Sequence, residues 1–340
     1  MVTLFDVAQQ AGVSVMTVSR ILRGHPGVKE STRKRVLRVM DELHYAPHGS
    51  VAEKRSFRNI LALLVPDLTN PFFTFIARGM EDVARRNGYR VILASTDEDL
   101  AKERNSLAMC LNYHVAGILI CPVGDRSVTA LTDVIQRSVP VVLVDRGVPG
   151  VVADIVKGNV EESSYALVSH LIALGHRSIA VVTGPLDNES SRERVAGYQR
   201  ACDDHGLAIG REYIHITSML RDGSAEFIDR LLALPDPPSA LFVANIFQYA
   251  KVYQRITALG QRVPESLSVV GFGNADEAIA IDSLLTAAVQ PAYSFGSLGT
   301  QMLLERINGM TDPPRRMVLE SRLLFRGSAG RPAGMPSSSR

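Results

Sequence analysis

The sequence predicts a small all-α head with a helix-turn-helix, followed by a two-lobed α/β body with parallel sheets. Apolar residues recur at helical spacing through the first part of the chain. From Ile60 onward, short apolar runs alternate with amphipathic segments, which is the pattern of a parallel sheet covered by helices. This alternation occurs twice, so we expect two similar lobes.

Two short helices are predicted around a glycine turn. The apolar stripe of the first helix consists of Leu4, Val7, Ala8 and Ala11. Gly12 breaks this periodicity and tolerates the positive φ of a tight turn. Ser14 is the expected N-cap of the second helix, which spans residues 15–23 and carries Val18, Ile21 and Leu22 on its apolar face.

This pair of helices has the offsets of a DNA-binding helix-turn-helix. Ala8 is small where the second helix crosses the first, Gly12 makes the turn, and Val18 fills the angle between the helices. The face left exposed can enter the major groove, where arginine pairs with guanine and apolar side chains contact thymine methyl groups. That face comprises Val15, Met16, Thr17, Ser19, Arg20 and Arg23. The alternative is a helical hairpin inside a larger core.

Charge is concentrated at the N-terminal end of the chain. Residues 1–58 hold ten lysine and arginine residues against five acidic ones, whereas the rest of the chain is slightly acidic. A basic head suits phosphate binding. A third helix is expected from Lys29 onward, with a basic first turn that could equally be a solvated face. Its predicted buried side is Val36, Leu37, Val39, Met40 and Leu43.

Length and composition agree with a globular protein of two or three domains. The chain has 340 residues, of which 46% are hydrophobic. We see no secretory signal pattern and no apolar run long enough to cross a bilayer. Cys110, Cys121 and Cys202 lack metal-binding spacing and indicate buried, reduced thiols. We therefore expect a cytoplasmic protein without a metal site.

The body is predicted as strands and helices in alternation. The strands are ILALLV (60–65), RVILAS, GILICP, VPVVLVD, SIAVVTG, a strand near Ile214, ALFVAN and LSVVGFG. The helices with predicted bounds are 75–87, 102–113, 192–205, 224–234 and 247–259. After Arg326 the chain is small and polar, and we expect it to be disordered.

Longer motifs resemble those of the LacI/GalR family of bacterial transcription regulators. They are TLFDVAQQAGVSVMTVSRIL, STRKRVLRVMDELHYAP, VPDLTNPFF, HLIALGHRSIAVVTGP, RVAGY, VPESLSVVGF and VQP, in the order of the family and over almost the whole chain. The resemblance implies a periplasmic-binding-protein-like body whose chain crosses between lobes near residues 157, 289 and 315. It divides the chain into a head (1–46), a hinge (47–59), an effector-binding and dimerisation body (60–326) and a tail (327–340).

The resemblance also implies a function. It describes a homodimeric, sequence-specific DNA-binding regulator, a repressor without enzymatic activity or cofactor, which binds a palindromic operator and a small-molecule effector. Further DNA contacts are then expected at Thr3, Lys29, Thr32, Tyr45, Lys54 and Arg55. The hinge departs from the family pattern, because His48 follows Pro47 and Lys54 replaces the leucine that wedges between base steps.

Effector contacts are expected after the strands, where ligands of open α/β folds bind. The family motifs indicate Phe72, Phe73, Asp145, Ser190, Arg192, Arg194, Asn245 and Phe272. Two family aspartates are absent, being replaced by Ile246 and Gly273. The effector is therefore either less hydroxylated or acidic, or sensing has weakened. Arg194 has an alternative role, which is an ion pair with an acidic neighbour across the cleft.

Two other classes of protein remain open at this point. The body alone would fit a solute-binding protein for transport, although the basic head and the absence of a signal pattern argue against it. A sugar or nucleoside hydrolase would need an acid/base set such as Asp145, Asp187 and His176, which no motif spacing supports. In the sequence Gly-His-Arg, His176 is instead expected to cap the end of a helix.

Overall fold

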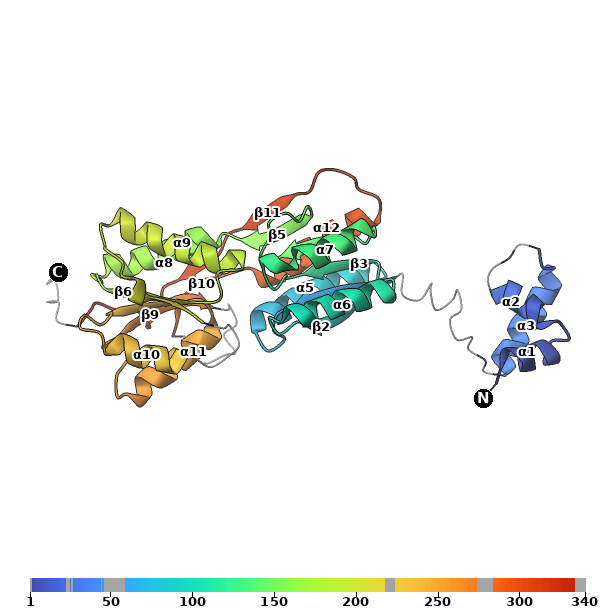
Figure 1. Ribbon diagram of the computed structural model, residues 1–340, viewed down its shortest axis with the longest axis horizontal. Coiled ribbons are helices and arrows are strands. Elements are labelled where there is room, and N and C mark those ends of the chain that lie inside the picture. Colours follow the sequence, from blue (N-terminus) through green and yellow to red (C-terminus); the bar gives the residue numbers. More distant parts are fainter. Residues whose placement is uncertain are drawn as a thin grey trace.

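A computed structural model describes residues 2–22, 25, 27–43, 45, 59–217, 224–273 and 284–333. The head consists of α1 (Leu4–Gln10), α2 (Val15–Leu22) and α3 (Glu30–Glu42), packed as a compact trio (Figure 1). Gly12 has a φ of +62°, and the Ser14 Oγ accepts a hydrogen bond from the Thr17 amide at 3.1 Å. Both features of the predicted turn are confirmed.

The core of the head is built from the predicted apolar stripes. Its buried members are Val7, Ala8, Ala11, Val18, Ile21, Val36 and Val39. The prediction for Leu37 is wrong, because this side chain is 49% exposed. Leu37 follows Val36 by one residue, a rotation of about 100°, so it lies beyond the stripe that Val36 and Val39 share.

One six-stranded sheet forms the N-terminal lobe, with the strand order β11-β5-β4-β3-β1-β2. All of its pairings are parallel. The strands are β1 (Ile60–Val65), β2 (Arg90–Ser95), β3 (Gly117–Ile120), β4 (Val141–Val144), β5 (Asp154–Gly158) and β11 (Arg316–Leu319). The helices of this lobe are α5 (Pro71–Arg86), α6 (Leu100–Asn112), α7 (Val128–Gln136) and α12 (Ala292–Ile307), with the short η2 (Asp125–Ser127).

A second six-stranded sheet forms the C-terminal lobe, with the order β12-β10-β9-β8-β6-β7. Among its described strands, β12 pairs antiparallel and the others pair in parallel. The strands are β6 (Ile179–Thr183), β7 (Ile214–Ile216), β8 (Ala240–Val243), β9 (Ser268–Gly273), β10 (Thr286–Val289) and β12 (Arg322–Leu324). The helices are α8 (Val160–Ala173), α9 (Glu189–Asp204), α10 (Ser224–Leu232) and α11 (Ile246–Ala258), with η3 (Arg211–Tyr213).

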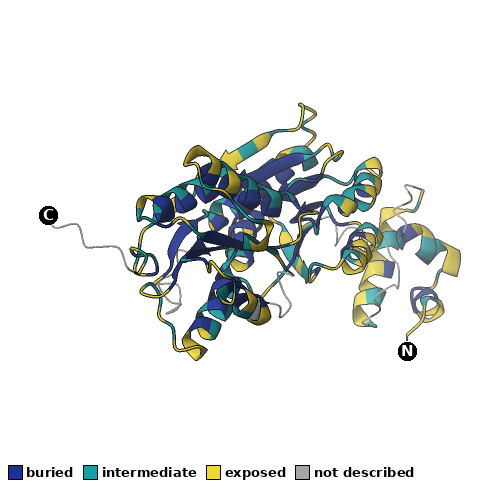
Figure 2. Ribbon diagram, turned by 60° about the vertical axis from the view of Figure 1, so that its left-hand side comes forward, coloured by how far each residue is buried: buried dark blue, intermediate teal, exposed yellow. Residues whose placement is uncertain are grey.

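Both sheets are buried between helices, as the continuous apolar strands predict. In β1, Leu61 and Leu63 pack in one core with α5 and α12, whereas Ala62 and Leu64 pack in another with α6 and α7. In the second lobe α8 and α9 cover one face and α10 and α11 the other (Figure 1). Figure 2 shows the buried strands between helices whose outer faces are exposed. The two-lobed parallel α/β architecture is thus confirmed.

Within the described ranges of the body, the chain passes between the lobes three times. It leaves the first sheet after Gly158, returns after Val289 to enter α12, and crosses again between β11 and β12. The last crossing therefore follows Leu319, a few residues later than the expected position near 315, because β11 itself belongs to the first sheet. The predicted hinge, 47–59, lies outside the described residues except for residue 59.

Several helices begin earlier than predicted because polar side chains cap them. The α5 helix starts at Pro71 and not at residue 75, since the Asn70 Oδ1 accepts from the Phe72 amide at 3.0 Å. The α9 helix starts at Glu189 and not at residue 192, with Asn188 accepting from the Ser191 amide at 2.9 Å. Asparagine at the N-cap satisfies amides that the first turn leaves without partners.

The predicted disorder after Arg326 is wrong for residues 327–333. Ser328 is buried, accepts from the Thr286 amide at 2.7 Å and donates to the Val269 carbonyl at 2.5 Å. His176 does not cap a helix with its ring; its Nε2 lies 2.9 Å from the Gly330 carbonyl oxygen and its Nδ1 2.8 Å from the Ser239 Oγ. Hydrogen bonds therefore hold the start of the tail against the second sheet. Residues 334–340 lie outside the described part.

Candidate functional site

The head presents one outward-facing surface on α2. Met16 is 64% exposed, and Val15 and Arg20 are also exposed, whereas Val18 and Ile21 face the core. Thr17 and Ser19 are half-buried at its edge, and the Thr17 hydroxyl lies 2.9 Å from that of Ser14. An exposed arginine beside apolar side chains on a short helix has the chemistry to contact base edges. Arg23, Lys54 and Arg55, also predicted to contact DNA, lie outside the described residues.

The other residues of the head that are predicted to contact DNA differ in their exposure and in the contacts they already make. Thr3 caps α1, since its hydroxyl accepts from the Asp6 amide at 3.4 Å and donates to the Asp6 carboxylate at 2.7 Å. Lys29 is exposed just before α3, and Thr32 is half-buried in its first turn. Tyr45 packs against the core of the head. Thr3 and Tyr45 thus already have structural roles.

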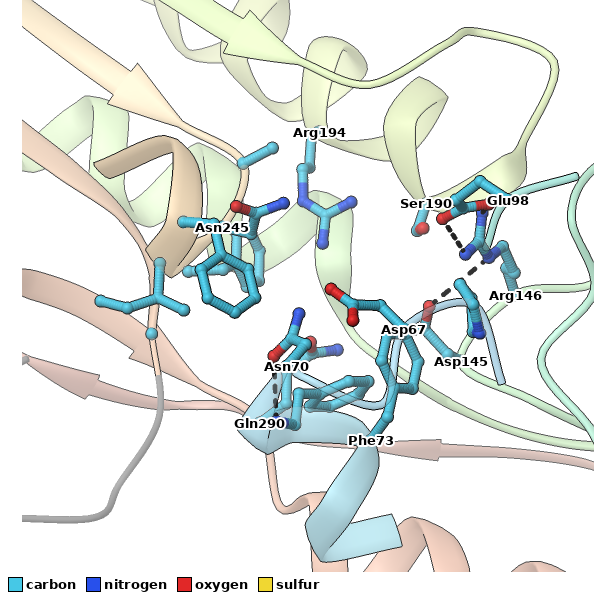
Figure 3. A pocket seen from close by; sticks show the side chains of 17 residues that line it. Asp67, Asn70, Phe73, Glu98, Asp145, Arg146, Ser190, Arg194, Asn245 and Gln290 are labelled. Carbon is cyan, nitrogen blue, oxygen red and sulfur yellow. Dashed lines mark hydrogen bonds and ion pairs between the residues drawn. The ribbon is translucent and has the colours of Figure 1, made fainter. Parts of the chain in front are cut away.

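A cleft opens between the two lobes at the carboxyl ends of their strands. Counted together with its opening to solvent, the space in this cleft is about 670 Å³. Residues after β1, β4, β8 and β10 line it, together with the first turns of α5 and α9. Figure 3 shows the polar members converging on the cleft: Asp67, Asn70, Glu98, Asp145, Arg146, Ser190, Arg194, Asn245 and Gln290.

Arg194 is the central polar group of the cleft. It extends from α9 into the space between the lobes, is 6% exposed, and its guanidinium carbon lies 4.7 Å from the centre of the Phe272 ring (Figure 3). Its Nε and Nη1 are buried without an acceptor. Burial lowers the pKa of this guanidinium, because loss of water disfavours the charged form. No carboxylate in the described part of the chain forms an ion pair with it, so the alternative role as an ion-pair partner is not supported.

The neighbouring arginine, Arg146, already has hydrogen-bond partners for its guanidinium group. Arg146 is buried and forms a bidentate pair with Glu98, with Nη2–Oε1 at 2.8 Å and Nη1–Oε2 at 3.3 Å (Figure 3). Its Nη1 also donates to the Val123 carbonyl at 3.2 Å. Glu98 and Asp145 hold positive φ angles of 53° and 71°. Such strained backbone is concentrated at binding sites, and here it places both carboxylates at the wall of the cleft.

Aromatic and amide groups complete the lining. Phe72 and Phe73 do line the cleft, but from the first turn of α5 and not from a loop, and Phe72 packs edge-to-face on Phe73 at 5.1 Å. Asn245 contributes its side chain to the cap of α11, accepting from the Gln248 amide at 2.9 Å. The Gln290 Nε2 is buried without an acceptor, as are two nitrogens of Arg194. The cleft therefore offers donors that need acceptors from a ligand.

The prediction that Arg192 binds the effector is not supported by its position. Arg192 does not line the cleft; its guanidinium forms a bidentate pair with Asp125, at 2.7 and 3.1 Å, and also donates to the Leu186 carbonyl. On α9 it lies two residues before Arg194, which rotates it by about 200° to the opposite side of the helix. Ser190 lies four residues before Arg194 and does line the cleft.

Asp67, Glu98 and Gln290 line the cleft although they were not predicted to bind the effector. Each follows the end of a strand by no more than three residues, in β1, β2 and β10. The rule that ligands sit at the carboxyl ends of parallel strands applies to all of them. Position directly after a strand therefore indicates these residues, whereas the family motifs do not include them.

His176 and the three cysteines do not line the cleft. Both ring nitrogens of His176 have partners away from the cleft, which leaves the hydrolase hypothesis without its histidine. The three cysteines are buried free thiols, as predicted, and burial raises the pKa of Cys110 to about 11. Within the described ranges no cluster of metal-ligating side chains occurs, and no helix is long and apolar enough to span a membrane.

A helix-turn-helix head joined to a two-lobed body with a cleft defines the class of DNA-binding transcription regulators, and comparisons identify the family. Residues 3–48 match the bacterial regulatory proteins of the lacI family, and residues 168–329 match a periplasmic binding protein-like domain. The chain belongs to the lacI family of bacterial regulatory proteins.

Individual relatives agree over nearly the whole chain. It is 32% identical to catabolite control protein A of Priestia megaterium, covering 96% of this chain and 99% of that protein. It is 30% identical to the HTH-type transcriptional repressor PurR of Photobacterium profundum, covering 96% and 98%. The second of these relatives is, by its name, a transcriptional repressor.

Solved structures give the same assignment. A complex of the transcriptional regulator CelR with cellobiose has a TM-score of 0.71 and 28% identity, covering 96% of this chain and 100% of that one. The lac repressor dimer bound to operator and the anti-inducer ONPF has a TM-score of 0.71 and 25% identity, covering 97% and 99%.

Proposed function

We propose that the protein is a cytoplasmic, homodimeric repressor that binds a palindromic operator, and that a small-molecule effector in the cleft modulates its operator affinity. The observation that carries the effector site is the buried guanidinium of Arg194, two of whose nitrogens lack acceptors. A ligand with hydroxyl or carbonyl oxygens would satisfy them. The aromatic wall of Phe72 and Phe73 suits the apolar face of a sugar or nucleobase.

Two relatives of known structure support this proposal. One solved relative binds cellobiose, and another is a dimer on operator DNA. One helix-turn-helix reads one half-site, so two-fold symmetry in the protein matches an inverted repeat in DNA. The domain boundaries proposed for this mechanism are a head at 1–46, a hinge at 47–59 and a body at 60–326.

Selection of bound fragments from genomic DNA tests this function directly. We expect the full-length protein to enrich inverted repeats, and metabolites of the neighbouring genes' pathway to change its affinity for them. The proposal fails if the protein shows no preference for any inverted-repeat duplex over random DNA at moderate ionic strength, with or without these metabolites. A stable monomer on DNA would contradict the two-fold arrangement.

Arg20→Ala is expected to weaken binding to the selected operator by about 1–3 kcal/mol and to relax preference at one base pair. Arg20 is exposed on the outward face of α2 and does not contribute to the core of the head. Fluorescence anisotropy on the operator and on single-base variants measures both effects. Unchanged affinity and preference would remove Arg20 from the base-reading set.

Lys29→Ala is expected to weaken binding to all duplexes about equally and to reduce the salt slope by about one. Lys29 is exposed just before α3, and its side chain forms no cap hydrogen bond, so its loss leaves the head folded. Binding to operator and random DNA across a salt series gives the slope. An effect confined to one sequence would contradict a phosphate contact.

A further inference from the structure

A buried lysine joins the two lobes beside the first crossing of the chain. Lys157 lies in β5 of the N-terminal lobe, one residue before the strand ends, and is only 1% exposed. Its Nζ lies 2.5 Å from the Glu193 Oε1 and 2.9 Å from the Glu189 Oε1, both on α9 of the C-terminal lobe. A buried ammonium is costly unless it is paired, so this cation holds the helix of the other lobe against β5.

Two further groups of the N-terminal lobe bind the same helix through Glu189. The Gly147 amide donates to its Oε2 at 2.5 Å, and the Arg316 Nη2 lies 3.1 Å from its Oε1. Hydrogen bonds from Gly147 and Lys157 outweigh the effect of burial and lower the pKa of Glu189, so its carboxylate stays charged. Glu189 is therefore held by three groups of the opposite lobe.

A second set of contacts joins the same end of α9 to η2. Arg192 forms its bidentate pair with Asp125, and the Asp125 amide donates to the Asp187 carbonyl at 2.7 Å. These groups are half exposed, so water weakens their attraction more than that of the buried Lys157 contacts. Together the two sets place the first turns of α9 against the N-terminal lobe.

The same turns of α9 carry residues of the cleft. Ser190 and Arg194 follow Glu189 and Glu193 directly in sequence, and both line the cleft (Figure 3). A small rotation or shift of this helix would move the Arg194 guanidinium relative to the opposite wall. The contacts between the lobes and the contacts to a ligand are thus placed on one rigid element.

We propose that Lys157, held between Glu189 and Glu193, is a positioning residue that fixes the spacing of the lobes and the place of Arg194 in the cleft. The spacing is a property of the ligand-free protein. Only the consequence for ligand affinity rests on the proposed effector function. Without Lys157, Glu189 and Glu193 would face each other one helical turn apart with no lysine between them, and the buried Oε2 of Glu193 already has no partner. The two side chains would then be buried against β5 without their cation, and the cost of keeping carboxylates away from water favours separation of the lobes.

Distances between spin labels in the full-length protein test the spacing without any effector. Labels at Thr129→Cys on α7 and Gln199→Cys on α9 lie on exposed positions of opposite lobes, whereas the native cysteines are buried. In samples diluted with unlabelled chain, so that a dimer carries labels on one protomer only, we expect one narrow distance distribution for the parent and a longer, broader one for Lys157→Met. The matched control is Lys102→Met, which removes an exposed lysine paired with Asp97 inside one lobe and should leave the distribution unchanged.

The double variant Lys157→Met/Glu193→Met separates positioning from misfolding. It removes the unpaired buried carboxylate along with the lysine, so we expect its melting temperature to recover towards the parent while the distance distribution stays broad. A parent-like distribution in either Lys157 variant would overturn the proposal. With a ligand found by screening the parent, Lys157→Met should bind about tenfold more weakly, in the range of coupling between sites. If no ligand is found, the proposed effector function fails. The distance measurement still tests the proposed role of Lys157, because it needs no ligand.

Discussion

Replacing Arg194 with methionine is expected to raise the melting temperature of the ligand-free protein and to weaken effector binding. The guanidinium is 6% exposed and two of its nitrogens have no acceptor, so the folded protein carries an uncompensated desolvation cost. Exchange of a buried ion pair for apolar side chains of similar volume is neutral or stabilises by about 1–4 kcal/mol in known cases, and Arg194 has no ion-pair partner whose loss would offset such a gain. Methionine also retains contact with the Phe272 ring.

The same substitution removes the donors that a ligand would use. Loss of a charge-assisted hydrogen bond costs about 1.5–3 kcal/mol of binding free energy, or roughly 10- to 150-fold in affinity. Thermal unfolding with and without ligand measures both effects in one experiment, and size-exclusion chromatography checks the oligomeric state. Arg146→Met is the contrasting variant: it should lower the melting temperature, because it leaves Glu98 without its bidentate partner. A lower melting temperature for Arg194→Met would make Arg194 structural.

The architecture was predictable because apolar runs are long where a strand is buried on both faces. The runs ILALLV and SIAVVT can be recognised without knowledge of their neighbours, and each forms a strand that is paired on both sides. The start of α5 was missed for the opposite reason, since Asn70 and Pro71 form a capped first turn in a stretch that resembles a loop. Caps depend on one side chain and leave no periodic signal.

Charged residues obscured β5, for which no strand was predicted. Its sequence, DIVKG, includes Asp154 and Lys157, which are almost fully buried and paired with residues far along the chain. A single sequence does not reveal such partners, because Arg306 and Glu193 approach only after folding. Ser328 in the tail is a similar case, since a serine acquires its buried hydrogen bonds from strands that precede it by many residues.

The sequence predicted correctly two cleft residues of α9. It was wrong for a third, whose side chain points to another side of the same helix. Arg194 and Ser190 share one face of α9, four residues apart, and both line the cleft. Arg192 lies between them and faces Asp125. Motif matching assigned all three to the effector because it carried no information on rotation around the helix axis.

Asp154→Ala is expected to destabilise the N-terminal lobe by about 3 kcal/mol, the lower end of the range for breaking a buried ion pair. The Asp154 side chain is inaccessible to solvent and accepts from Arg306 at 2.8 and 2.9 Å, and from the Arg315 amide at 2.7 Å. The lower end applies because the side chain of Arg306 is 17% exposed and that of Arg315 is 37% exposed. Urea unfolding measures the loss, and Asp133→Ala, which breaks an exposed pair with Arg137, should change stability little.

The stabilisation by Asp154 also has a defined pH dependence. Burial alone would raise the pKa of Asp154, but hydrogen bonds from Arg306 and Arg315 outweigh burial and lower it below 3.8. A carboxylate whose pKa is lower in the folded state contributes stability at pH values above its unfolded pKa, and this contribution disappears as the pH falls through the folded value. The difference in unfolding free energy between the parent and Asp154→Asn should therefore be constant from neutral pH to about pH 5 and shrink below about 3.8. A difference that persists unchanged at lower pH would mean that packing, and not the charge of Asp154, holds β5 to α12 and β11.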